Sequence, residues 1–214
     1  GANGLHRDLE PIELEPMDPA ELDGGLEAIT EYRHAPTQVI GDKSFDEIRT
    51  SEVAGQLVDV VKDVGPIRNE TAFKAVISRW AISRLGGSIR KSMSGISLNL
   101  HPDRLVKHDG FLWPPDRPET IPIRTNTDSA SRSIEEIPLE EIAKTCSLIL
   151  ENGGTMARDD LVLETARLFG YQRRGETIET RITEAIGGQV EIGGATEFNG
   201  MEAETAEAND LVLE

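Results

Sequence analysis

The apolar positions of this chain follow one pattern twice. Residues 44–97 and residues 133–186 show the same order of apolar and polar positions, without a gap and at a constant offset of 89 residues. Apolar residues of the first stretch return as apolar residues in the second: Phe45, Ile48, Val53, Leu57, Val60 and Val61 correspond to Ile134, Ile137, Ile142, Cys146, Ile149 and Leu150. An internal repeat of this length predicts two copies of one small structural unit.

Each copy begins with the signature of a helix start. Ser44 and Glu47, and likewise Ser133 and Glu136, show the S-x-x-E spacing of a capping box, in which two side chains satisfy free backbone amides. Helical spacing of apolar residues follows, and it ends near Val64 in copy one and near Asn152 in copy two. The pattern therefore predicts a first helix in each copy.

Two more helices are predicted in each copy. Short extended pieces, 66–67 and 155–156, precede a second helix that begins near Asn69 or Asp159, both residues that favour a helix cap. A glycine-containing turn leads to a third helix, whose inward residues are Ile89, Met93 and Ile96 in copy one and Ile178, Ile182 and Ala185 in copy two.

A hairpin is predicted after the third helix of copy one. Asp109 and Gly110 separate the apolar segments 105–107 and 111–113, and Asp-Gly between such segments is a strong turn signal. Copy two offers only the single apolar segment 189–192. The predicted fold class is mainly α with short β hairpins, in the form of a tandem winged helix-turn-helix repeat, and the two units are expected to share a packed face.

Five segments are predicted along the chain. They are an acidic, extended N-terminal arm (1–43) with one short helix around residues 19–29, a first winged-helix repeat (44–113), a proline-rich connector (114–132) with an edge strand around 120–124, a second winged-helix repeat (133–194) and an acidic disordered tail (195–214).

The distribution of charge changes the meaning of the formal net charge of −17. Residues 1–43 carry 3 basic and 10 acidic groups, residues 44–132 carry 13 and 11, and residues 133–214 carry 6 and 18. Between Glu70 and Asp103 there is no acid at all. Because distant charges are screened at physiological salt, this local excess of basic residues matters more to a nucleic acid than the total does.

Most signatures of catalysis are absent. The sequence lacks a P-loop motif, a nucleophile elbow and metal-ligand spacing among its one Cys and four His. Cys146 occupies an apolar position of the repeat, which predicts a buried residue. We therefore expect no enzyme activity and no cofactor from this chain. No segment resembles a membrane span or a signal peptide, and a cytoplasmic location is expected.

The motif R-x-G-x-[ST]-I occurs in both copies, at 84–89 and at 173–178. It precedes the third helix, where free amides favour an anion and where an arginine can hold a phosphate at two points. The predicted nucleic-acid-binding residues of copy one, including two on the hairpin, are Arg84, Gly86, Ser88, Arg90, Lys91, Lys107 and His108. Weaker candidates in copy two are Arg173, Arg174 and Gly175, since four glutamates surround them in the sequence.

A structural role for the same turn is the competing interpretation. The arginine of the turn would then hold the second and third helices at their angle and pair with the acidic first helix. In that case the chain is a docking or homodimerisation module without nucleic-acid contact.

Several short motifs occur in a fixed order along the chain: Val64-Gly65-Pro66-Ile67, Arg79-Trp80, Arg84-x-Gly86-x-x-Ile89, Gly110-Phe111-Leu112-Trp113, Ile123-Arg124 and Phe169-Gly170-Tyr171-x-Arg173-x-Gly175. Together they resemble domain-of-unknown-function family 3320. The resemblance covers roughly residues 30–194, and it departs from the family at Asn69, where a His often follows the Pro-Ile pair.

The resemblance implies a setting for the chain. The family forms the C-terminal accessory domain of large bacterial proteins that resemble superfamily-one helicases, with a nuclease domain like very-short-patch-repair enzymes and a proposed role in phage defence. We therefore expect a non-catalytic accessory module of a helicase/nuclease-like parent, whose first repeat contacts DNA through backbone phosphates and groove, whose second repeat is a scaffold, and whose other partners are domains of the same protein.

Overall fold

The computed structural model describes residues 12–13, 29–115 and 121–192. About half of these residues are helical. Within the described ranges there are six α-helices: α1 (Thr50–Val64), α2 (Asn69–Ser78), α3 (Gly87–Asn99), α4 (Leu139–Gly153), α5 (Arg158–Leu168) and α6 (Glu176–Ile192). The strands described are short: β1 (Ile12–Glu13), β2 (Ile29–Glu31), β3 (Ile67–Arg68), β4 (Val106–His108), β5 (Phe111–Trp113), β6 (Ile123–Thr125) and β7 (Arg173–Arg174).

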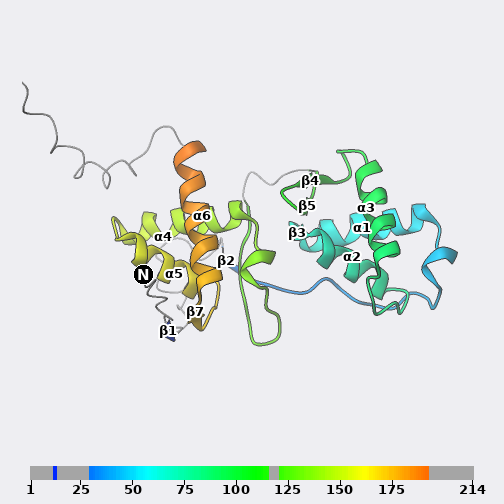
Figure 1. Cartoon of the computed structure of the whole chain (residues 1–214), viewed down its shortest axis with the longest axis horizontal. Coiled ribbons are helices and arrows are strands. Elements are labelled where there is room, and N and C mark those ends of the chain that lie inside the picture. Colours follow the sequence, from blue (N-terminus) through cyan, green and yellow to red (C-terminus); the bar gives the residue numbers. More distant parts are fainter. Residues whose placement is uncertain (1–11, 14–28, 116–120, 193–214) are drawn as a thin grey trace, which may run out of the picture.

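The helices form two groups along the long axis of the molecule (Figure 1). Helices α1–α3 belong to repeat 1 (residues 44–113), and α4–α6 belong to repeat 2 (residues 133–194). Each group encloses its own core of buried apolar side chains, centred on Leu57, Phe73 and Met93 in repeat 1 and on Ile142, Phe169 and Ile182 in repeat 2. The residues that the repeat pattern marks as inward are therefore buried or pack against these cores.

Both predicted capping boxes are present, but the helix that each one starts is a single 3-10 turn. Ser44 caps residues 45–47 and Ser133 caps residues 134–136. The chain then becomes extended at Ile48 and Ile137, and α1 and α4 begin only at Thr50 and Leu139. In repeat 2 the reason is Pro138, which disfavours helical geometry in the residue before it. Ile48 and Ile137 use the extended geometry to insert into the cores, where both are buried.

The hairpin of repeat 1 forms as predicted. Strand β5 pairs antiparallel with β4 and with β3, which gives the strand order β3-β5-β4. Asp109 and Gly110 both have positive φ angles, 53° and 79°, as a two-residue hairpin turn requires. Leu112 points into the core of repeat 1, and its neighbours Phe111 and Trp113 are buried outside both cores.

Repeat 2 departs from the prediction at its strands. Residues 155–156 are not a strand, and residues 189–192 continue α6 as a helix. A lone apolar segment has no second strand to pair with, whereas a helix satisfies its backbone hydrogen bonds locally. The described part of repeat 2 consequently has no hairpin after its third helix.

The N-terminal arm supplies strands to repeat 2 and its connector. β1 pairs antiparallel with β7, and β2 pairs in parallel with β6. The edge strand predicted in the connector thus exists, although it begins at Ile123. The short helix predicted around 19–29 lies outside the described residues except for Ile29, which begins β2. The predicted acidic tail also lies outside them.

Two further expectations concern the burial of Cys146 and the absence of a membrane span. Cys146 is fully buried, and burial raises the pKa of its thiol to about 11, as suits a core residue rather than a nucleophile. None of the described helices combines the length and the apolar character that a bilayer crossing requires.

Candidate nucleic-acid interface

Helix α3 of repeat 1 has one buried and one exposed side. Met93 is fully buried, and Ile89 and Ile96 pack against the same core. Ser88, Lys91 and Ser92 are exposed on the other side. At Gly95, on the same side, a β-carbon would meet no atom within 4 Å. The outward surface of α3 therefore carries small polar residues, a positive charge at Lys91 and one exposed apolar residue, Leu98, and α3 contains no acidic residue.

The turn before α3 exposes Arg84. Gly86 is the N-cap of α3, and its amide donates a hydrogen bond to the carbonyl oxygen of Arg84 at 3.1 Å. The side chain of Arg84 is exposed and forms no ion pair with the described residues, the acids of α1 included. The geometry thus leaves the Arg84 guanidinium accessible, whereas the structural interpretation of the turn required it to be paired.

Arg90 is the one predicted basic contact on α3 that already has an acidic neighbour. Its Nε lies 2.9 Å from Oε1 of Glu70, which lies in the first turn of α2, and both side chains are about half exposed. Exposed pairs of this kind contribute at most about 1 kcal/mol to stability. The pair joins α2 to α3 and partly neutralises this corner of the basic surface.

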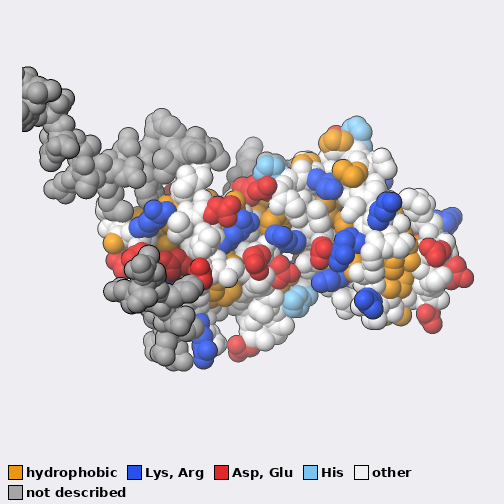
Figure 2. Space-filling view, in the orientation of Figure 1, with side chains coloured by type: hydrophobic (Ala, Val, Ile, Leu, Met, Phe, Trp, Pro, Cys, Tyr) orange, Lys and Arg blue, Asp and Glu red, His pale blue; other side chains and the backbone are white. Residues whose placement is uncertain are grey.

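The hairpin lies beside repeat 2. His108 Nε2 is 3.1 Å from Glu140 Oε1, in the first turn of α4. The carbonyl oxygen of Gly110 accepts a hydrogen bond from the amide of Asn69 at 3.0 Å, which ties the hairpin tip to the start of α2. Lys107 remains exposed on the edge strand β4. Figure 2 shows Lys and Arg side chains on the visible face of repeat 1, over α2, α3 and the hairpin.

The same turn in repeat 2 has different neighbours. Arg173 and Arg174 form strand β7 and are covered along one edge by β1. Arg174 is mostly buried and contacts Glu179 at 3.0 Å and Asp159 at 3.8 Å. Gly175 precedes α6, and its carbonyl oxygen accepts a hydrogen bond from the amide of Glu179. The weaker set of predicted contacts is thus engaged within repeat 2.

A buried charge network joins the two repeats, and the sequence analysis did not identify it. Glu141 on α4 is fully buried and accepts hydrogen bonds from the guanidinium groups of Arg124 and Arg132. Arg124 also donates to the carbonyl oxygens of Val64 at 2.7 Å and Pro66 at 3.0 Å, at the end of α1. Burial raises the pKa of Glu141, but the two arginines lower it more, so that it lies below the usual 4.5.

The repeat pattern explains why this network could not be predicted from the sequence. Glu141 corresponds to Glu52 of repeat 1, which is partly exposed and pairs with Arg49. Acidic residues in the first turn of a helix are ordinarily explained by the helix dipole. The one unusual feature in the sequence was Arg124, which directly follows the apolar residue Ile123. Its partners Val64, Pro66 and Glu141 are distant in the sequence.

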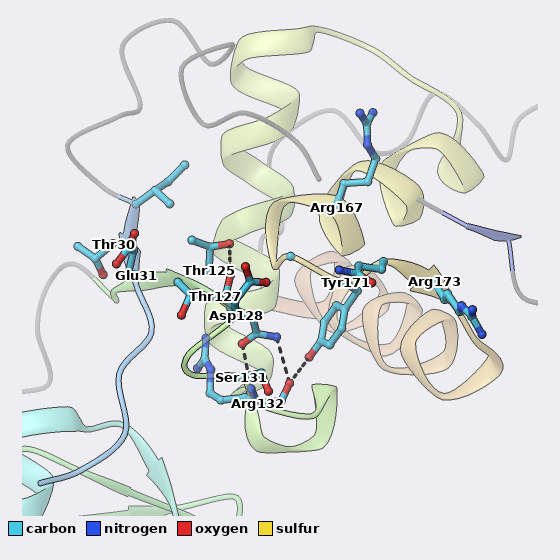
Figure 3. A pocket seen from close by; sticks show the side chains of 14 residues that line it. Thr30, Glu31, Thr125, Thr127, Asp128, Ser131, Arg132, Arg167, Tyr171 and Arg173 are labelled. Carbon is cyan, nitrogen blue, oxygen red and sulfur yellow. Dashed lines mark hydrogen bonds between the residues drawn. The ribbon is translucent and has the colours of Figure 1, made fainter. Parts of the chain in front are cut away.

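A pocket of about 850 Å³ lies between β2, the loop 125–132 and the turn 170–173. Figure 3 shows that the side chains of Arg167 and Arg173 point away from its centre, while Tyr171 is directed at the loop, where its hydroxyl donates to the carbonyl oxygen of Arg132. Arg132 itself is held by Glu141. The arginines that line the pocket are thus not directed at a ligand, and no cluster of His, Cys, Asp and Glu among the described residues is suited to hold a metal ion.

Comparison of the chain with models of known protein families, with curated proteins and with solved structures gives no match. The resemblance to family 3320 therefore remains a prediction that rests on the short motifs given above.

Proposed function

We propose that this chain is a non-catalytic accessory module in which repeat 1 contacts DNA and repeat 2 acts as its scaffold. The contacting residues are Arg84, Ser88, Arg90 and Lys91, with Gly86 allowing the backbone to approach and Lys107 adding a flanking phosphate contact. His108 contributes less, because its ring already pairs with Glu140. Following the resemblance, the parent protein is a helicase/nuclease-like bacterial protein.

The observation that carries the proposal is the contrast between the two copies of one turn. In repeat 1, Arg84 is exposed and has no acidic partner among the described residues. In repeat 2 the residue equivalent to Arg84 is Arg173, which lies in strand β7 and is paired there with β1, and its neighbour Arg174 is held by Glu179 and Asp159. A turn with a purely structural role would have similar neighbours in both copies. The difference supports a role for repeat 1 in binding an external anion.

The order of elements in repeat 1 also supports the proposal. The sequence α1–β3–α2–α3–β4–β5, with the strand order β3-β5-β4, is the arrangement expected of a winged helix-turn-helix unit. In such units the third helix enters the major groove. The name fits repeat 2 less well, because α6 continues where a hairpin was expected.

A protein-docking role is the second candidate. Leu98 on α3 is 69% exposed, which is unusual for a leucine. Beside α3 there is a groove of about 650 Å³ that is lined in part by Phe45, Ala54 and Ile96. Apolar surface of this kind is typical of protein interaction sites. Light scattering of the purified chain tests the homodimer form of this role.

The test is fluorescence anisotropy with the full chain and labelled DNA across a salt series. Arg84→Glu and Lys91→Glu, tested singly, are expected to weaken binding roughly tenfold at low salt, because each replaces a phosphate contact by a repulsion. Arg158→Glu is the matched control, since it makes the same change of charge at an exposed position of repeat 2. No binding at about 50 mM salt, where phosphate contacts are strong, contradicts the proposal.

A further inference from the structure

On the basis of the proposed function, we infer that residues 195–214 regulate the DNA-binding surface of repeat 1 by docking on helix α3 of the same chain. In this arrangement the acidic side chains of the segment face Arg84 and Lys91, and its apolar residues at 211–213 cover the groove beside α3. DNA and the segment then compete for one surface. Three observations carry the inference: the uncovered apolar surface at α3, the contrast with repeat 2, and the distribution of charge.

Helix α3 bears apolar surface that no other described residue covers. Leu98 is 69% exposed, the highest value among the large apolar side chains of the described residues. Between α3 and the start of α1 lies a groove of about 650 Å³, and Phe45, Ala54 and Ile96 are among the residues that line it. Asp46 also lines the groove, so a carboxylate is disfavoured there. The groove therefore favours a ligand with apolar side chains.

The corresponding surface of repeat 2 carries larger side chains. At the constant offset of 89 residues, Ser92 and Gly95 of α3 correspond to Arg181 and Glu184 of α6, which pair with each other at 2.9 Å. Leu98 corresponds to a glycine. Repeat 2 thus has an ion pair where repeat 1 has small residues, and it lacks the leucine. Open space and an exposed apolar side chain occur together in repeat 1, as a surface that receives a ligand requires.

The distribution of charge directs the segment away from repeat 2. Residues 195–214 contain six acidic residues, no basic residue and no histidine, and they include the apolar run at 211–213. Repeat 2, to which the segment is joined, has 12 acidic and 6 basic residues between positions 133 and 192. Repulsion between like charges therefore disfavours contact of the segment with repeat 2.

Helix α3 offers the opposite charge within reach of the segment. No acid occurs between Glu70 and Asp103, and in this stretch Arg84 and Lys91 are exposed. The 22 residues that follow Ile192 can span up to about 70 Å, whereas a compact chain of this size has a radius of gyration of about 17 Å. The segment is thus long enough to reach α3, and it matches that surface in both charge and apolar character.

The docking is measured first in the absence of DNA. A fluorescein-labelled peptide of residues 195–214 is titrated with the chain cut at residue 194, which retains every described residue. Leu98→Ser or Lys91→Glu in that chain is expected to weaken peptide binding at least about tenfold. Arg158→Glu, the same change of charge as Lys91→Glu at an exposed position of repeat 2, is expected to leave it within about twofold. A peptide that does not bind overturns the inference.

Competition with DNA is measured by anisotropy of labelled duplex DNA with the full chain. The triple variant Leu211→Ser, Val212→Ser and Leu213→Ser keeps all six acids of the segment and is expected to tighten DNA binding about threefold to tenfold. Leu98→Ser should give the same gain in the full chain and no change in the chain cut at 194, because Leu98 contacts the segment and not DNA. Unchanged binding in both variants overturns the inference, since the segment then acts through net charge alone.

The remaining outcomes separate this inference from the proposed function. DNA binding that is equal in the full chain and in the chain cut at 194 overturns the inference and leaves the proposed function standing. Absence of DNA binding by both rejects the proposed function, while the peptide titration still decides the docking. Sedimentation velocity identifies the occupant of α3: a dimeric full chain beside a monomeric cut chain shows that the segment docks on a second copy, and this overturns the intramolecular arrangement.

Discussion

Arg124 Nη2 lies 2.7 Å from Glu141 Oε2, and both side chains are buried where the two repeats meet. The same guanidinium donates to two carbonyl oxygens at the end of α1, so one side chain connects the C-terminus of a helix in repeat 1 to a carboxylate in repeat 2. A cation at this end of a helix also complements the helix dipole. Arg132 completes the network by binding the other side of Glu141.

Removing Arg124 is expected to destabilise the protein strongly. The variant Arg124→Met leaves Glu141 buried with one partner fewer and should lower the free energy of unfolding by about 3–5 kcal/mol. Arg33→Met is the control, because Arg33 pairs with Asp63 on the surface and should contribute no more than about 1 kcal/mol. Urea unfolding followed by circular dichroism measures both changes. Similar losses in the two variants contradict the role given to Arg124.

The network also predicts the behaviour of the protein in acid. Because the pKa of Glu141 is lower in the folded protein than its usual 4.5, its ionised form stabilises the fold above the unfolded pKa. This contribution is lost as the pH falls through the folded pKa. Urea unfolding at a series of pH values from neutral to acidic should show a smaller decrease in Glu141→Gln than in the unmodified protein. The prediction fails if the two decreases are equal.

Glu70 is expected to limit the affinity of repeat 1 for DNA. Its carboxylate pairs with Arg90 at 2.9 Å and is exposed, so Glu70→Gln should release Arg90 without unfolding the protein. Binding of duplex DNA should tighten roughly threefold to tenfold, and its dependence on salt should steepen by about one phosphate contact. Anisotropy titrations at several salt concentrations measure both. Glu52→Gln, on α1, is the control for the change in charge, and an equal gain there argues against a specific effect of Glu70.

Two glycines of repeat 1 should respond to alanine in opposite directions. At Gly65 a β-carbon would overlap the carbonyl oxygen of Val61 and lie 3.1 Å from Cδ of Pro114, so Gly65→Ala should destabilise by about 1–3 kcal/mol. Gly55 lies within α1 and has no atom within 4 Å of that position, so Gly55→Ala should stabilise by about 0.5–1 kcal/mol. Thermal unfolding of the two variants compares them directly. A stabilised Gly65→Ala protein contradicts the close approach at this corner.

Much of each repeat could be predicted from the sequence because it rests on local signals. Helix α1 ends at Val64, where the helical spacing stops, and the turn at Asp109 and Gly110 forms the hairpin that its residue types indicate. Both capping boxes were predicted correctly, but each one starts a short 3-10 turn and not the first long helix of its repeat. The extended residues that follow, Ile48 and Ile137, are both buried, and only Ile137 has a local cause for its geometry, the proline that follows it.

The candidate interface was predicted only as a set of residue types. The sequence indicated that the two copies of the turn differ in charge. It did not reveal that Arg90 pairs with Glu70, that His108 lies against Glu140, or that β1 covers β7. These contacts join residues that are distant in the chain, and they distinguish an accessible arginine from one that is engaged within the fold.

The sequence by itself determined that the unit is repeated, that each copy has three helices and that repeat 1 has a hairpin, because apolar periodicity and turn residues act over a few neighbouring residues. Only the tertiary structure decided which strands the N-terminal arm pairs with, whether a hairpin follows α6, and where Glu141 finds its partners. Strand pairing and the burial of a charge depend on groups from separate segments, such as Arg124 and the carbonyl oxygen of Val64, which are 60 residues apart. These interactions stabilise the protein only once the fold brings the distant groups together, so no local pattern in the sequence predicts them.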